Sequence, residues 1–188
     1  MTFSVFGYGS LVNQKTLPPY VSARPVALKG WRRAWRATSV AHAGGVCALS
    51  VVPGEDTIEG LLVTFDDEVR PVVDAREYRY DALSCEELGP DALIFRAQSG
   101  VDRFGDAANP VHLSYVDVVV QGFLAEFGEA GVERFMATTD GWHVPILDDR
   151  AAPRYPRAQV LTQNERALTD RMLRMVDATF LSTDEAHP

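Results

Sequence analysis

The chain of 188 residues has few cysteines and lacks a long apolar run. Its two cysteines, Cys47 and Cys85, match neither a redox pair nor a zinc motif, and two thiols in a chain of this length do not indicate a secreted disulfide scaffold. No stretch approaches the roughly 18 consecutive apolar residues of a membrane-spanning helix, and the first residues lack the positively charged start of a secretory signal. We therefore expect a soluble, cytoplasmic protein with buried free thiols and no membrane partner.

Basic residues are also scarce, with 18 Lys and Arg against 26 Asp and Glu and a formal net charge of -8. Nucleic-acid binding needs concentrated cations, so this balance argues against a nucleic-acid partner. One basic and aromatic cluster could stack on a single strand, or it could be a strand with one apolar and one solvated face. We favour the strand. The cluster comprises Trp31, Arg32, Arg33, Trp35 and Arg36.

The histidines do not form a metal motif. None is spaced two or four residues from another histidine or from a cysteine, so we predict no metal site. The four are His42, His112, His143 and His187.

Short β-branched and aromatic runs dominate the first half of the chain. They are bounded by Gly or Pro at a spacing typical of an antiparallel meander or barrel. The predicted strands are residues 3–6, 25–28, 31–38, 46–52, 57–65, 78–83 and 92–97. Residues 53–56 read as a hairpin connection, and the polar residues 100–110 as a loop that could border a pocket.

Helical patterns become prominent in the second half. We predict a short helix over residues 66–76 with Asp66 as its N-cap, and a helix over 114–127 that is capped by Ser114 and closed by Gly128. A capping-box sequence at 162–165 opens an amphipathic helix over 162–181. Strands followed by helices indicate an α+β fold. We divide the chain into a core, 1–128, and a C-terminal extension, 129–188, whose helix packs on the same domain.

The first strand leads into a glycine-containing turn, Gly7-Tyr8-Gly9-Ser10. A dinucleotide fingerprint would need a third glycine where Val12 stands, and a nucleophile elbow centred on Ser10 would need one at Tyr8 as well. What remains is a turn whose backbone N–H groups can point at an anion or a developing oxyanion. An ordinary strand-ending turn has the same sequence, so the residues alone leave both interpretations open.

Glu77 lies where the predicted helix of 66–76 gives way to a strand. A side chain at such a junction can be aimed into a cavity, where burial would raise its pKa. A glutamate flanked by Arg76 and Arg79 is more often a solvated ion-pair partner. Composition and spacing do not decide between these roles.

Taken in order, the motifs resemble the γ-glutamyl cyclotransferase-like family, including its glutathione-specific branch and the plant avirulence-induced-gene-like proteins. The resemblance covers residues 3–128. It rests on Tyr8-Gly9-Ser10-Leu11, on Gly30-Trp31-Arg32, on Ile58-Glu59-Gly60-Leu61-Leu62, on Glu77 followed by Tyr80, and on the segment from Pro110 to Tyr115.

This resemblance implies a small antiparallel or mixed β-barrel, closed or nearly closed, with flanking helices. It also implies that the α-amine of a γ-glutamyl compound attacks its own γ-carbonyl, which forms 5-oxoproline and releases an amino acid, peptide or amine. Glu77 would be the general acid/base. Substrate would bind to Tyr8, Gly9, Ser10, Leu11, Tyr80 and Tyr115. The nucleophile belongs to the substrate, so no cofactor is expected.

Two features depart from the family pattern. Val12 and Asn13 follow the turn where the glutathione-specific branch has tryptophan, so the identity of the γ-glutamyl substrate stays open. Residues 129–157 match nothing in the family and could form a lid or an interface. A homodimer also stays open. The alternative is a non-catalytic protein of the same fold that binds a small anionic metabolite. Glu77 argues against this alternative, because a carboxylate does not help a site to bind anions.

Overall fold

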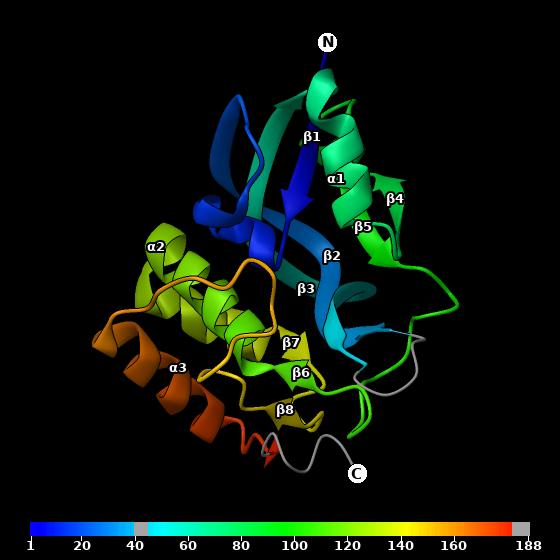
Figure 1. Ribbon diagram of the computed structural model, residues 1–188. Coiled ribbons are helices and arrows are strands. Elements are labelled where there is room, and N and C mark those ends of the chain that lie inside the picture. Colours follow the sequence, from blue (N-terminus) through cyan, green and yellow to red (C-terminus); the bar gives the residue numbers. More distant parts are fainter. Residues whose placement is uncertain (40–44, 182–188) are drawn as a thin grey trace.

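The computed structural model describes residues 1–39 and 45–181, so His42 and His187 lie outside the described residues. The fold is α+β, as predicted, with a large mixed sheet and three α-helices in the described chain. Figure 1 shows helix α1 beside the upper part of the sheet, while α2 and α3 lie side by side at the other end of the molecule. No helix within these ranges combines the length and apolar composition that a membrane crossing requires.

The sheet runs in the order β4-β5-β1-β3-β6-β8-β9, and β2 pairs with both β3 and β7. Its strands are β1 (Thr2–Gly7), β2 (Ser22–Thr38), β3 (Cys47–Asp66), β4 (Tyr80–Ser84), β5 (Ala92–Ala97), β6 (Val111–His112), β7 (Thr139–Asp140), β8 (Ile146–Leu147) and β9 (Phe180–Leu181). Strand β1 is antiparallel to β3 and parallel to β5. Strands β4 and β9 end this order without pairing to each other, so the predicted barrel closure is not confirmed.

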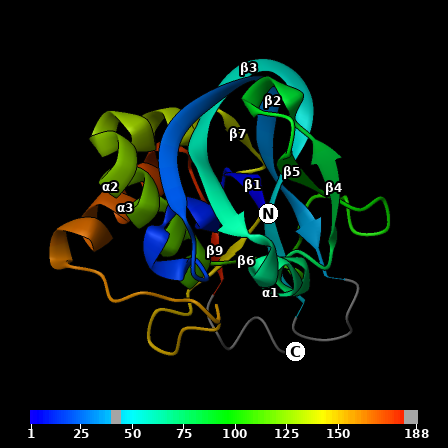
Figure 2. The same ribbon diagram turned by 90° about the horizontal axis from the view of Figure 1, so that it is seen from above.

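Two long strands replace four of the predicted short ones (Figure 2). Gly30, with φ of +88°, forms a bulge between Lys29 and Trp31, so β2 bends there instead of ending. The predicted hairpin connection at 53–56 was wrong, because β3 runs through it and Pro53 pairs with Trp31. Pro and Gly mark a bend in this ribbon, where the sequence pattern indicated a turn.

Helices α1 (Arg70–Arg76) and α3 (Gln163–Met175) lie where the sequence predicted helices. A 3-10 turn, Asp67–Val69, precedes α1, and the side chain of Asp66 does not cap that turn, which corrects the predicted N-cap. The capping box of α3 is confirmed, because Thr162 Oγ1 accepts from Glu165 N at 3.2 Å and Glu165 accepts from Thr162 N at 2.6 Å. Helix α3 ends six residues before the predicted end at 181.

Helix α2 (Leu113–Ala137) begins one residue before the predicted N-cap and has a break at Gly128, where φ is +67°. Ser114 therefore lies inside the helix. The cap comes from the buried Asp149, whose carboxylate accepts from Ser114 N at 2.8 Å and from Ser114 Oγ at 2.6 Å. A carboxylate at a helix N-terminus satisfies free N–H groups and complements the helix dipole, so this contact fixes the start of α2.

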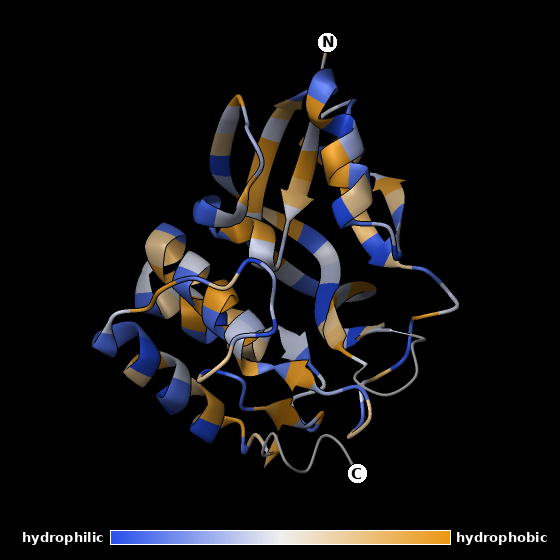
Figure 3. Cartoon of the chain, viewed as in Figure 1, coloured by the Kyte–Doolittle hydropathy of each residue, from blue (hydrophilic) through white to orange (hydrophobic). Residues whose placement is uncertain are grey.

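One large hydrophobic cluster joins the sheet to all three helices. It includes Phe6 of β1, Leu61 of β3, Phe123 of α2 and Leu173 of α3. Hydrophilic and hydrophobic residues alternate along α3 in Figure 3, as expected for an amphipathic helix. The division at residue 128 stays a prediction.

Candidate active site

The turn after β1 is tied to neighbouring strands from two sides. The buried Tyr8 donates from its hydroxyl to the Phe95 carbonyl at 2.6 Å, and the Tyr8 carbonyl accepts from Arg33 Nε at 2.8 Å. Arg33 is fully buried, packs over the Phe123 and Phe135 rings and also bonds to the Glu59 carbonyl. Burial lowers the pKa of Arg33 to about 9. Gly9 and Ser10 are therefore held in a constrained turn, not in a loose strand end.

A single 3-10 turn, Ser10–Val12, follows Gly9. Val12 N donates to the Gly9 carbonyl at 2.9 Å, which closes the turn. The first N–H groups of a helical turn have no acceptor within it. Accordingly, the N–H groups of Ser10 and Leu11 have no hydrogen-bond acceptor among the described residues. They are free to serve a ligand.

Glu77 lies at the junction predicted for it, as the residue that caps the C-terminus of α1. Its N–H donates to the Val73 carbonyl, and its carbonyl accepts from Tyr80 N at 2.8 Å, so the main chain turns directly from helix to strand. The side chain is only 13% exposed, which excludes a freely solvated role. Its Oε1 lies 3.4 Å from Arg76 Nε.

Burial raises the pKa of Glu77 above 4.5, against the opposing charges of Arg76, Arg157 and Arg79. A carboxyl group with a raised pKa is better matched to proton transfer near neutral pH than an exposed one. The environment of Glu77 is therefore suited to proton transfer.

Arg76, which the sequence interpretation did not select, connects the two motifs. Its guanidinium donates to the Thr16 carbonyl at 2.8 Å and to Ser10 Oγ at 3.0 Å, beside its contact with Glu77. Its side chain is 6% exposed. The sequence signal was present in the Arg76-Glu77 pair, but only the fold brings the Ser10 turn within reach of it.

Three tyrosines surround Glu77. Tyr80 donates from its hydroxyl to the Leu49 carbonyl at 2.7 Å, and the Tyr115 ring packs at 4.9 Å from the Tyr155 ring. Burial raises the pKa of each of Tyr8, Tyr80 and Tyr115 above the ordinary value of a tyrosine, and the negative charge of Glu77 raises each pKa further. All three hydroxyls therefore stay protonated and can donate or orient without adding charge.

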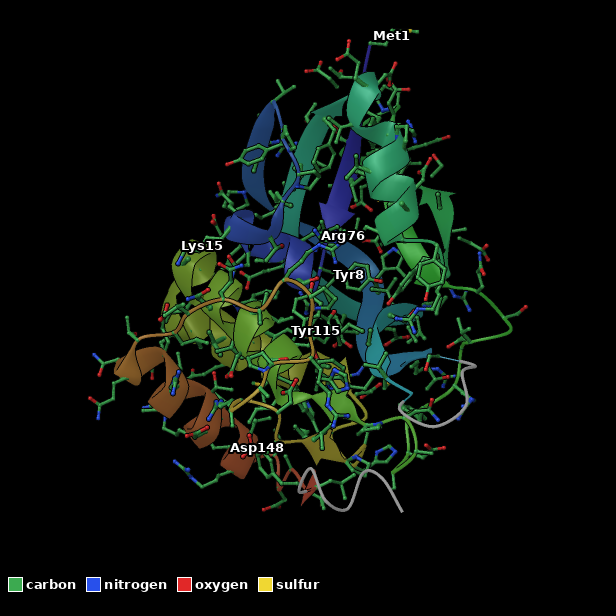
Figure 4. The ribbon with its side chains drawn as sticks, in the orientation of Figure 1. Met1, Tyr8, Lys15, Arg76, Tyr115 and Asp148 are labelled. Atoms are coloured by element: carbon green, nitrogen blue, oxygen red, sulfur yellow. The ribbon has the colours of Figure 1, made fainter. Side chains whose placement is uncertain are left out.

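Two adjoining pockets meet at these residues. Figure 4 shows the labelled Tyr8, Arg76 and Tyr115 near one another in the middle of the molecule. The inner pocket has a volume of about 40 Å³ and the outer pocket about 360 Å³. Ser10, Glu77, Tyr80 and Tyr115 line both. Tyr8, Gly9 and Leu11 line the inner one only. All seven residues predicted for the site thus converge on one place.

Residues 148–157, which we call the covering segment, contribute to the outer wall through their last four residues. Figure 1 shows this segment passing in front of α2. Two arrangements anchor it. Asp149 accepts from Arg154 N as well as from Ser114, and Arg150 pairs with Asp117 of α2 and Asp170 of α3 at 2.7 and 2.6 Å. Residues 154–157 then line the outer pocket. Part of the region left open as a lid or an interface therefore covers the site.

The basic and aromatic cluster of β2 is not an exposed cationic surface. Arg33 and Trp35 are buried, Arg32 pairs with Asp56 and Asp140, and Arg36 pairs with Asp102. Arg33 lies between Trp31 and Trp35 on the same strand face, and this alternation was the signal that could have identified it as buried. The absence of a nucleic-acid partner stays a prediction.

The comparisons with known proteins agree with this geometry. A family model for ChaC-like proteins matches residues 3–70. A solved structure of a γ-glutamyl cyclotransferase has a TM-score of 0.56 at 10% identity, over 91% of this chain and 99% of that chain. An uncharacterized human protein gives a TM-score of 0.53 at 10% identity, over 90% and 98%. YkqA from Bacillus subtilis gives 0.53 at 16% identity, over 72% of this chain and 53% of its own. No curated protein sequence matches the chain.

At these identities, the solved structures establish the class of fold, which is that of the γ-glutamyl cyclotransferases. The predicted resemblance to the γ-glutamyl cyclotransferase-like family is confirmed by the ChaC-like match over residues 3–70 and by the shared fold.

Proposed function

We propose that this protein is a γ-glutamyl cyclotransferase that releases 5-oxoproline, with Glu77 as its general acid/base. One observation carries the proposal most strongly. A largely buried carboxyl group, with a raised pKa, lies between the Ser10 turn and two neutral tyrosines, at the wall that two pockets share. A structural ion pair would not require that position.

The reaction needs two protons to leave the α-ammonium group of the substrate and two to reach the leaving nitrogen. In the proposed sequence, the Glu77 carboxylate takes a proton from the α-ammonium group, and the amine attacks the γ-carbonyl carbon. A C–N bond forms and the carbonyl oxygen becomes an oxyanion. Glu77 then protonates the leaving nitrogen as its C–N bond breaks. The remaining proton also passes to that nitrogen, so 5-oxoproline and an ammonium product result.

The turn supplies the remaining requirement, stabilisation of the oxyanion. The N–H groups of Ser10 and Leu11 have no protein acceptor among the described residues, and donors fixed in advance are the most effective kind. Arg76 holds Ser10 Oγ and contacts Glu77, so we assign it a positioning role. Tyr80 and Tyr115 would orient the substrate. The absence of a cofactor stays part of the proposal.

The test is to incubate the pure protein with glutathione, γ-glutamyl amino acids and γ-glutamyl amines and to measure 5-oxoproline. We expect turnover of at least one compound, and about 10²–10⁴-fold less turnover in Glu77→Gln, because the amide cannot transfer protons. kcat/KM should fall as the pH drops through a pKa above 4.5. Wild-type turnover by a folded Glu77→Gln variant would contradict the assignment of Glu77. Binding of these compounds without turnover by the wild type would favour the metabolite-binding alternative.

A further inference from the structure

Arg79 has a buried guanidinium nitrogen, NH1, without a hydrogen-bond partner in the described chain. Its side chain forms none of the ion pairs found within residues 1–39 and 45–181, and its guanidinium carbon lies 5.6 Å from the centroid of the Tyr78 ring. Leaving a cationic N–H buried and unpaired is unfavourable, and buried polar groups are satisfied in the great majority of proteins. Such a group in a pocket indicates an anionic ligand.

The outer pocket in which Arg79 lies is strongly cationic. Among the described residues, four arginines line it, Arg76, Arg79, Arg154 and Arg157, and Glu77 is the single carboxylate. Burial lowers the pKa of His112, the histidine in the same wall, so that residue is largely uncharged at neutral pH. The whole chain carries a net charge of -8, which makes this local excess of cations a specific feature.

The positions of the four arginines relative to Glu77 show which part of a substrate Arg79 would meet. Arg76 is already engaged by Thr16, Ser10 and Glu77. Arg79 lines the outer pocket and not the inner one, whereas Glu77 lines both. If the reacting γ-carbonyl lies between Glu77 and the turn of the inner pocket, the group released from it extends into the outer pocket.

We propose that Arg79 binds a carboxylate on the leaving group and so selects γ-glutamyl amino acids and peptides over γ-glutamyl amines. This inference rests on the proposed function. Arg79 acts as a specificity residue, since it contacts the part of the substrate that does not react. The cationic side chain of Arg157, which lines the same pocket, adds to the attraction.

The experiment compares two substrates that differ only in this charge, γ-glutamyl-alanine and γ-glutamyl-alaninamide, with 5-oxoproline as the readout. The wild type is expected to prefer the acid by about 10–100-fold in kcat/KM, as for a charge-assisted hydrogen bond in a partly buried site. Arg79→Gln should lose that preference, with a fall of about 10–100-fold for the acid and a change of a few-fold at most for the amide. Arg171→Gln, on the exposed face of α3, is the matched control and should retain both rates.

Equal losses on both substrates in Arg79→Gln would overturn the proposal, because they would place Arg79 at the γ-glutamyl head or in the support of the fold. Equal kcat/KM values of the wild type for the acid and the amide would also overturn the proposal. This comparison needs no variant, so it holds even if Arg79→Gln fails to fold. No 5-oxoproline from any γ-glutamyl compound would instead contradict the cyclotransferase activity itself.

Discussion

The Gly9→Ala variant tests whether the turn at Gly9 and Ser10 takes part in the reaction or only ends strand β1. Gly9 has φ of -128°, so it is not needed for a left-handed conformation. A Cβ at this position would lie 3.1 Å from the Tyr115 hydroxyl and 3.4 Å from Leu49 Cδ1. The added methyl group therefore enters the inner pocket and pushes on a side chain that we assign to substrate binding.

The structure sets the expected magnitudes. A contact of 3.1 Å requires a shift of a few tenths of an ångström, and alanine also restricts the unfolded chain, so stability should change by no more than about 1 kcal/mol. The inner pocket has a volume of only about 40 Å³, so a methyl group added at its wall takes space that the substrate needs. Displaced reacting groups commonly cost about 10²-fold, so we expect about that loss in kcat/KM.

Kinetics and thermal unfolding should be measured on the same preparation. For a chain of this size, 1 kcal/mol corresponds to a Tm shift of about 2–4 °C. Gly100→Ala is the matched control, because a Cβ there meets nothing within 4 Å and should change neither quantity. A kcat/KM for Gly9→Ala within about threefold of the wild type would refute the reasoning and return the turn to a purely structural role.

Three further predictions follow from buried or capping groups. The raised pKa of Glu77 means that its ionised form destabilises the folded state, so the wild type should lose stability relative to Glu77→Gln as the pH rises from below 4.5 through that pKa; parallel urea melts of equal pH dependence would contradict this. Arg33→Lys should cost about 2–5 kcal/mol, because it leaves buried carbonyls without partners, whereas Arg24→Lys on the exposed part of β2 should change urea stability little. Thr162→Ala should cost about 1 kcal/mol by loss of the capping box, and an unchanged midpoint of unfolding would argue against that cap.

Local chemistry made several elements of this fold predictable. The capping box of α3 acts through residues three apart, and the Glu77 junction depends on a short helix and the strand after it. Neither needs a distant partner. The sequence therefore located both, and it located strand β5 without error.

The errors have a common physical cause, which is a partner distant in sequence. Pro53 was interpreted as a turn because the sequence does not reveal its pairing with Trp31 across a bulge. Ser114 was interpreted as a helix cap, although the cap comes from Asp149, 35 residues later. The sheet likewise remains open, since closure depends on which edges meet.

The same dependence on distant partners explains why only part of the site was found. The seven predicted residues belong to motifs of the family resemblance, but the charges around them come from Arg76, Arg79 and the covering segment. Interactions between exposed charges are screened over about 8 Å at physiological ionic strength. A bound substrate therefore responds mainly to the cationic pocket, and the acidic remainder of the surface has little influence on it. An anionic leaving group is thus compatible with a protein whose net charge is -8.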